Sequence, residues 1–202
     1  MRRAQSVALA VAIVTLGAPA RAQTCTESQY RWPEKTSLDF VDLAATSATI
    51  HAMLTTWPVP EIYHGDKCMD RSGRELKTYS VRGWVRLRKS EADLDWHIEL
   101  TATKTAAVPD HCVVVEIPDP SFGHQFQIAR DQFDALVTAA GVSFNGNTPS
   151  EPVRMKFLGV AFFDGGHRGA QGTSNPPSGH GRCGGTSRAL WEIHPVYLVV
   201  AP

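Results

Sequence analysis

The sequence predicts a mainly β (α+β) domain: an OB-fold-like five-stranded barrel with one helix between strands 3 and 4, plus an N-terminal extension. Several segments place an apolar residue at every second position, which is typical of half-buried strands. One segment has the helical period instead. The resulting order of strand, strand, strand, helix, strand, strand is that of the OB fold. An open α+β sheet with a helix on one face has the same order and is the alternative.

A cleavable signal peptide is predicted for residues 1–22. Two arginines precede a predominantly apolar run of ten residues at 7–16, and residues 20–22 read Ala-Arg-Ala, a pattern that signal peptidase cleaves. Ten apolar residues are too few for a membrane anchor, which needs about twenty. Thr24 before Cys25 does not fit a lipoprotein signal. We therefore expect a secreted or periplasmic protein with no membrane anchor in its mature form.

Residues 23–75 are predicted to form an N-terminal extension with a short helix and a loop. Ser47 can cap a helix that continues through Leu54. The Trp-Pro-Val-Pro stretch at 57–60 ends that helix, because proline cannot continue one. Turn-forming residues dominate the rest of the extension. The barrel domain is therefore expected to span residues 76–202.

The first three barrel strands follow from two alternating segments and one apolar run. Apolar and polar residues alternate over 79–88 and again over 94–101. The short polar segment 90–93 between them predicts a β-hairpin. The apolar run at 112–117, which is followed by prolines, predicts the third strand.

A helix, a strand, a long loop and a last strand complete the predicted barrel. Residues 128–140 carry apolar side chains at helical spacing, and Gly141 stands where a helix C-cap belongs. Strands are expected at 153–163 and 191–200. The glycine-rich segment 165–185 is expected to be a loop, and loops of that length within a compact domain are often functional.

The charge balance argues against nucleic acid as a partner. Lys plus Arg number 20 and Asp plus Glu number 20 over the chain. Non-specific nucleic-acid binding depends on an excess of positive charge that neutralises phosphates. A small local basic patch remains compatible with this balance.

Four cysteines follow the predicted signal peptide, and an even number in an exported protein predicts two disulfides. Three connectivities are possible, and we favour Cys25–Cys68 and Cys112–Cys183. A zinc–thiolate site is the alternative. No two of the cysteines form the C-x-x-C pair that is typical of such sites.

Three short segments place carboxylates beside histidines. In an OB barrel, the loops joining strands 1–2 and 4–5 stand at the binding edge, and all three segments lie near those loops. We therefore expect a His/carboxylate site at one end of the barrel. Its candidate ligand-binding residues are Asp95, His97, Glu99, Asp164, His167, Glu192 and His194.

A divalent transition metal is a possible cofactor, though none is certain. Carboxylate and imidazole ligands together suit zinc, iron, nickel or manganese, and the possible metal ligands are His97, His167 and His194. Without a metal, a His–carboxylate pair can still act as a general base. The structural alternative is a solvated strand face, with Asp164 as a turn former. The segments match no self-sufficient catalytic motif, so no catalytic residue is assigned.

Trp84 is a further ligand-binding candidate. It alternates with Arg82, Arg86 and Arg88 on the expected outer face of the first strand. An aromatic ring among arginines can stack on bases or sugars. Alternatively, the N-terminal segment or the arginine stems cover the ring.

Two segments resemble an uncharacterised family of secreted bacterial proteins. They are Phe-Phe-Asp-Gly-Gly-His at 162–167 and Trp-Glu-Ile-His-Pro-Val at 191–196. That family shares D-x-H, F-F-D-x-x-H and E-(I/L)-H-P-V motifs, and Asp95 with His97 would supply the first. The chain differs from the family pattern in its enlarged, cysteine-bearing loop before the last strand. The resemblance implies no particular activity.

The function expected from these observations is binding of a small ligand, metal or polysaccharide at the His/carboxylate site. A metal-dependent hydrolase of the nuclease or phosphodiesterase type is the first alternative. A structural or interaction domain is the second.

Overall fold

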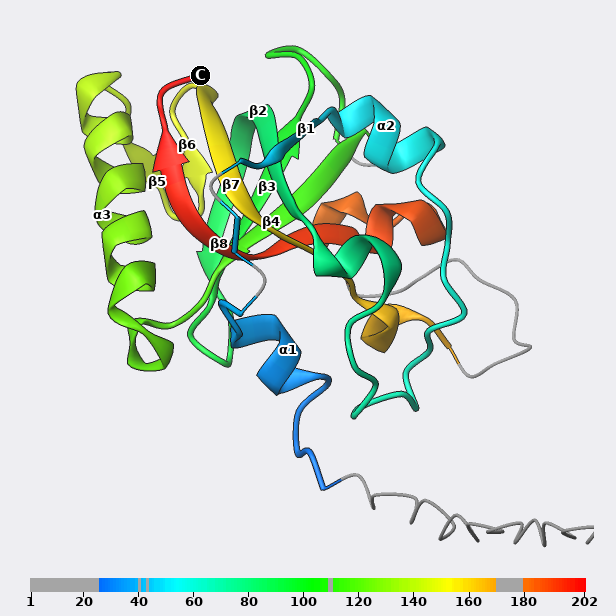
Figure 1. Cartoon of the computed structure of the whole chain (residues 1–202). Coiled ribbons are helices and arrows are strands. Elements are labelled where there is room, and N and C mark those ends of the chain that lie inside the picture. The colour runs from blue at the N-terminus through cyan, green and yellow to red at the C-terminus, as the bar shows by residue number, and fades with distance from the viewer. Residues whose placement is uncertain (1–25, 40, 43, 109–110, 170–179) are drawn as a thin grey trace, which may run out of the picture.

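Figure 1 shows the chain as a computed structural model. The predicted signal peptide at 1–22 lies outside the residues that the structure describes. Within the described part, no helix is both long enough and apolar enough to cross a membrane. The described residues are 26–39, 41–42, 44–108, 111–169 and 180–202.

Five strands close into a mixed barrel, which confirms the predicted OB-like fold. The strand order is β2-β3-β4-β8-β7, and β7 pairs with β2 to close the barrel. β4 and β8 run parallel, and the other neighbours run antiparallel. The alternative of an open sheet is therefore wrong. The barrel strands are β2 Thr78–Ser90, β3 Trp96–Thr101, β4 Cys112–Ile117, β7 Val153–Phe163 and β8 Trp191–Val200.

Helix α3, His124–Ala139, lies between β4 and β7 in the chain, as predicted, and flanks β8 in Figure 1. Its apolar face contributes Phe126 and Phe133 to the same core as the inward residues of the barrel. Burying such a side chain stabilises the fold by about 1.5–3 kcal/mol. Gly141 follows the helix with a φ of 67°, the left-handed conformation expected after a helix end.

Some element boundaries differ from the prediction for local reasons. β3 begins at Trp96 rather than at 94, because Leu94 has a φ of 70° in the preceding turn. α3 begins at His124, four residues before the expected 128, and Gly123 precedes it in a non-helical conformation. The predicted bounds of β4, β7 and β8 are confirmed.

The N-terminal extension contains more structure than its sequence predicts. Thr49, rather than Ser47, caps the expected short helix, because the strand β1, Thr46–Ala48, pairs in parallel with β2. The helix α1, Trp32–Thr36, was not predicted. The remaining elements of the extension and barrel are α2 Ile50–Thr55, β5 Phe144–Asn145, β6 Thr148–Pro149 and the 3₁₀ turns η1 Gly73–Leu76, η2 Pro120–Phe122, η3 Gly165–His167, η4 Gly181–Cys183 and η5 Ser187–Leu190.

Buried arginines hold the extension against the barrel. Arg31 is fully buried, and its guanidinium donates to both carboxylate oxygens of Glu75 at 2.8 and 3.0 Å. Both side chains reach Phe163 on β7: Arg31 Nη1 donates to its backbone carbonyl at 3.4 Å, and Glu75 Oε1 accepts its backbone N–H at 2.9 Å. The Nη2 atom of Arg71 donates to the backbone carbonyl of His194 on β8 at 2.7 Å. The extension is therefore fixed to the barrel wall that carries His194.

Candidate functional site

The His/carboxylate residues lie on the outer wall of the barrel rather than at its end. Val115 of β4 and Ile193 of β8 are register partners, and both belong to the core. Because side chains alternate along a strand, the next residues, Glu116 and His194, point outward. His97 lies directly opposite Glu116 on β3. The site is thus formed by side chains along β3, β4 and β8, which corrects the expected position.

This outer wall is covered by other segments. His97, Glu116, Glu192 and His194 are only 2, 7, 0 and 0 % exposed. Asp95 and Glu99 are buried as well. The alternative of a solvated strand face is therefore wrong for these residues.

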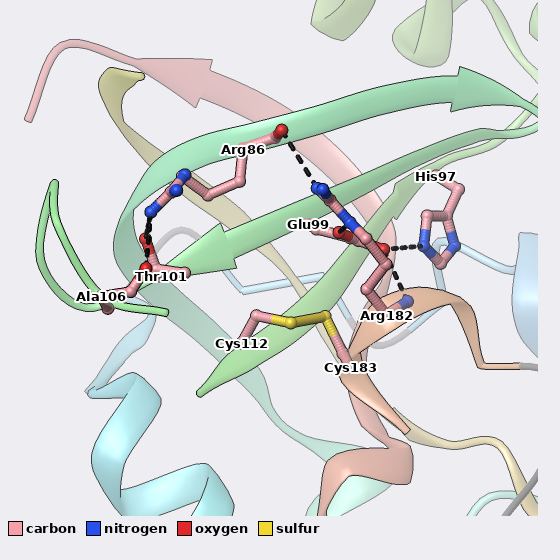
Figure 2. The surroundings of a disulfide bond; sticks show 8 residues. All are labelled: Arg86, His97, Glu99, Thr101, Ala106, Cys112, Arg182 and Cys183. Atoms are coloured by element: carbon pink, nitrogen blue, oxygen red, sulfur yellow. Dashed lines mark hydrogen bonds and ion pairs between the residues drawn. A yellow bond between two sulfur atoms is a disulfide. The ribbon is translucent and has the colours of Figure 1, made fainter. Parts of the chain in front are cut away.

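The turn η4 is one of the covering segments, and a disulfide holds it in place. Figure 2 shows the Cys112–Cys183 bond between β4 and η4, as predicted. Cys68 is also disulfide-bonded. Its expected partner, Cys25, lies outside the described residues.

Arg182 of η4 binds Glu99 on β3 through two groups. Its backbone N–H donates to Oε1 of Glu99 at 2.8 Å, and its Nε donates to Oε2 at 2.6 Å. The Nε2 atom of His97 lies 3.7 Å from Oε1 of Glu99. Figure 2 shows Arg182 and His97 approaching this carboxylate from different sides. The turn therefore covers the end of the site that His97 occupies.

Imidazoles and carboxylates alternate through the centre of the site. His97 Nδ1 forms a 2.9 Å hydrogen bond with Glu116 Oε1, and Glu116 Oε2 lies 3.0 Å from His194 Nδ1. His194 Nδ1 is also hydrogen-bonded to Glu192 Oε1 at 3.1 Å. Glu192 Oε2 in turn accepts a 3.1 Å hydrogen bond from His180 Nε2. Three histidines and two glutamates thus form one continuous buried chain of contacts.

Asp95 faces the second nitrogen of His194. Its Oδ2 atom lies 3.2 Å from His194 Nε2. Neither of these two buried atoms has a hydrogen-bond partner among the described residues. The other oxygen of Asp95 accepts the backbone N–H of Asp119 at 2.8 Å, which fixes the carboxylate in this orientation.

Lys35 of α1 contributes a positive charge to the site. Its Nζ atom lies 2.8 Å from Asp164 Oδ2 and 4.0 Å from Glu192 Oε1. Its side chain is only 12 % exposed. Burial alone would lower the pKa of Lys35, but Asp164, Glu192 and Glu116 raise it well above its usual value. The lysine is therefore a permanent cation.

The pKa shifts describe a cluster of ionised carboxylates around His194. Burial alone would lower the pKa of His194, but Asp95, Glu116 and Glu192 raise it well above its usual value. Burial and Glu116 would raise the pKa of Glu192, yet Lys35 and the neighbouring histidines bring it to about 2. The cluster therefore favours positive charge at its centre, which a proton or a metal cation can supply.

Three groups of side chains are close enough to hold a metal ion. Within each group, every residue offers one ligand atom, and these atoms lie within 4.8 Å of one another. Glu116 belongs to two of them and Glu192 to the third. A fourth group contains the two sulfurs of the Cys112–Cys183 disulfide, which are not available as thiolate ligands. The three groups are Asp95, Glu116 and His194; Asp164, His180 and Glu192; and Glu91, His97 and Glu116.

His167 and Trp84 lie apart from this centre. The His167 side chain is 34 % exposed, and its Nε2 lies 3.7 Å from Asp164 Oδ2. Its ring centroid is 5.1 Å from that of His180. Trp84 is half-buried on the outer face of β2, with Lys104 Nζ 5.8 Å from its ring centroid. His167 therefore borders the site, and Trp84 lies outside it.

Sequence reasoning missed Glu116, His180 and Lys35. Glu116 could have been found, because it is the one charged residue in the apolar run 112–117. His180 was assigned no role because it lies in the glycine-rich loop. Lys35 lies in a segment without periodicity, and nothing local to it indicates a contact with Asp164.

Comparisons of the chain with family models, with curated proteins and with solved structures find no match. The resemblance to secreted bacterial proteins therefore stays a prediction, and the function has to be argued from the site itself.

Proposed function

We propose that the protein binds a divalent transition-metal ion between Asp95 Oδ2 and His194 Nε2, in the buried cluster that also contains Glu116. The observation that carries the proposal is the 3.2 Å contact between Asp95 Oδ2 and His194 Nε2, two buried atoms that form an ion pair when the imidazole is protonated and that have no well-aligned hydrogen bond among the described residues. Buried polar atoms are nearly always partnered. Ligand atoms 2.0–2.2 Å from a tetrahedral zinc ion lie about 3.3–3.6 Å from one another, close to the observed contact. A shared ion would satisfy both atoms at this spacing.

The neighbours of the proposed ligands support the same assignment. A histidine that binds a metal through one nitrogen usually donates its other N–H to a carboxylate, which fixes the ring. His194 Nδ1 has two such carboxylates beside it, Glu116 at 3.0 Å and Glu192 at 3.1 Å. Glu116 is oriented in the same way by His97, at 2.9 Å. A mixed nitrogen and oxygen donor set suits zinc, and also iron, nickel or manganese.

We also propose that the protein works outside the cytoplasm, in the periplasm or after secretion. The Cys112–Cys183 disulfide supports this location, because disulfides persist in oxidising compartments. The predicted signal peptide points the same way. Fractionation of cells that express the full chain, followed by N-terminal sequencing of the exported form, tests it. Recovery of the uncleaved chain from the cytoplasm would argue against export.

The metal proposal is tested on the mature protein after chelator treatment and dialysis. Calorimetric titration with zinc should give about one ion per chain. His194→Gln should weaken binding by more than the roughly 10- to 100-fold that loss of an outer partner costs. The matched control is His124→Gln, an exposed histidine on α3. Equal zinc affinity in the two variants would overturn the proposal.

Metal-dependent hydrolysis is a second candidate, because Lys35 places a fixed positive charge beside the proposed ligands. Its Nζ is 4.0 Å from Oε1 of Glu192, the oxygen that is hydrogen-bonded to His194 Nδ1. A preorganised cation can stabilise the negative charge that develops when a phosphodiester is attacked. Zinc- and manganese-loaded protein should then hydrolyse bis(p-nitrophenyl) phosphate, and Lys35→Met should reduce the rate without lowering the metal content. Turnover no faster than that of the free ions would exclude this candidate.

A further inference from the structure

Three cations stand on the outer face of β2 and β7 with no carboxylate partner among the described residues. Arg82 of β2 lies directly opposite Lys156 of β7, and Arg154 lies opposite Trp84. No described residue forms an ion pair or a side-chain hydrogen bond with Arg82, Arg154 or Lys156. Because like charges directly opposite each other destabilise a sheet, folding alone does not explain this arrangement.

Other outward cations nearby are paired. Lys104 Nζ lies 2.9 Å from Glu151 Oε2, and Arg88 Nη1 lies 3.1 Å from Asp134 Oδ1. The barrel surface therefore does supply counter-charges elsewhere. The unpaired group on β2 and β7 is a distinct feature of the surface.

These cations line a hollow that is large enough for a small molecule. It has a volume of about 460 Å³ and lies where β1 and the start of α2 meet β2. Figure 1 shows β1 and α2 beside β2. Pockets for small molecules span roughly 300–1,000 Å³. The polar groups that line this cationic hollow are Ser47, Thr49, His51, Ser80, Arg82, Arg154 and Lys156.

We infer that the cationic hollow binds a small molecule carrying a tetrahedral oxyanion, such as a sugar phosphate or sulfate. Arginine forks bind such oxyanions through paired charge-assisted hydrogen bonds, and lysine adds a point charge. The hydroxyls of Ser47 and Ser80, which are partners in the β1–β2 register, can donate to further oxygens. The volume leaves room for the group that carries the oxyanion. This inference does not rest on the proposed metal site, which lies on β3, β4 and β8.

Calorimetric titration of the mature protein at low salt tests the inference with four probes: inorganic phosphate, inorganic sulfate, ribose 5-phosphate and ribose. Phosphate should bind, and its affinity should fall with added sodium chloride because salt screens the charges. Ribose 5-phosphate should bind more tightly than phosphate, and ribose should not bind measurably. The relative affinities of phosphate and sulfate identify which oxyanion the hollow prefers. No heat with any oxyanion would overturn the inference.

Two double variants distinguish binding in the hollow from a non-specific effect of losing two positive charges. Arg154→Gln/Lys156→Gln should weaken ribose 5-phosphate binding by about a hundredfold, or about tenfold for each cation. Lys67→Gln/Lys77→Gln removes the same charge outside the hollow and should bind as the wild type does. Equal losses in both variants would overturn the inference.

Thermal unfolding without ligand shows whether a loss of binding reflects misfolding. Lys156→Gln removes the opposed like charge beside Arg82, so its melting temperature should rise while binding falls. A variant that is destabilised and still binds ribose 5-phosphate at wild-type affinity would contradict the assignment of Lys156 to the hollow.

Discussion

Position 181 has room only for glycine. Gly181 has a φ of 58°, a conformation that side chains other than glycine rarely adopt. A Cβ atom there would lie 2.7 Å from Nε2 of His97 and 2.8 Å from Oε1 of Glu99. This glycine therefore allows η4 to approach β3 closely enough to bury both side chains.

We expect Gly181→Ala to lower the free energy of unfolding by about 1–3 kcal/mol, since it adds both backbone strain and a steric clash. Urea denaturation of the purified variant measures the change. Gly65→Ala is the control, because no atom lies within 4 Å of a Cβ there and its φ is ordinary. Similar losses in the two variants would contradict the close packing of η4 on β3.

Residues of the site could be predicted where neighbours in sequence are also neighbours in space. Glu192 and His194 stand two positions apart on one strand face, so alternation alone groups them. His180 reaches Glu192 from a loop, and no periodicity predicts that contact. The burial of His97 could not be predicted either, because His97 is covered by η4, which lies more than 80 residues away in the chain.

At the scale of the element, η4 acts as a cover that depends on two attachments. One is the Cys112–Cys183 disulfide, and the other is the pair of hydrogen bonds from Arg182 to Glu99. The attachments differ in their chemistry. The hydrogen bonds respond to pH, and the disulfide responds to reductant.

The contribution of Glu99 to stability should disappear in acid. Burial alone would raise its pKa, but His97 and Arg182 lower it below 4.5. A carboxylate with a lowered pKa stabilises the fold above its unfolded-state pKa and loses that contribution as the pH falls through its folded-state pKa. Glu99→Gln should therefore cost about 2 kcal/mol at pH 7 and progressively less below pH 4.5. Urea denaturation of both proteins across this range measures the difference, and a pH-independent difference would contradict the assignment.

Removing the disulfide should destabilise the protein more than any single hydrogen bond of η4 does. The bond joins residues 71 positions apart, and closing a loop of that length is worth about 4 kcal/mol in the chain-entropy model. We expect Cys112→Ser/Cys183→Ser to unfold at correspondingly lower urea concentration under non-reducing conditions. In reductant, the double variant and the wild type should become similar. A double variant as stable as the oxidised wild type would show that η4 is held by other contacts.

Elements with a strong period were predictable, and short ones were not. The apolar run of β4 and the alternation of β2 come from their own residues. β1 has only three residues and exists because it pairs with β2. α1 has five residues, too few for a periodic pattern, and its position depends on contacts of Arg31 with Phe163 and of Lys35 with Asp164.

For the whole molecule, the order of strands and helix in the sequence predicted the barrel, but it did not predict which segments cover the outer face of the barrel. Alternation correctly separates the inward residues of β3, β4 and β8 from the outward ones. It cannot predict that the N-terminal extension and η4 cover the outward face. Burial of charged residues on that face follows from these long-range contacts, because each buried charge needs a partner that another segment supplies.

The extension and the barrel should therefore unfold as one unit, and Arg31 is the residue that tests this. Its buried guanidinium contacts both Glu75, the last residue of the extension, at 2.8 Å and the backbone carbonyl of Phe163 on β7 at 3.4 Å, so Arg31→Met removes this link and leaves an uncompensated carboxylate inside the protein. Such a loss costs about 3–5 kcal/mol. Tryptophan fluorescence and circular dichroism should report a single urea transition at lower concentration than in the wild type.

The double variant Arg31→Met/Glu75→Gln provides the control for that prediction. Removing the charge of Glu75 as well takes away the penalty of an unpaired buried carboxylate, so part of the lost stability should return. The amide can still accept the backbone N–H of Phe163, which Glu75 Oε1 accepts at 2.9 Å. A double variant less stable than Arg31→Met would mean that Glu75 stabilises the barrel independently of Arg31. Two separate transitions in either variant would mean that the extension is only loosely attached, and that the wall carrying His194 can be uncovered while the barrel remains folded.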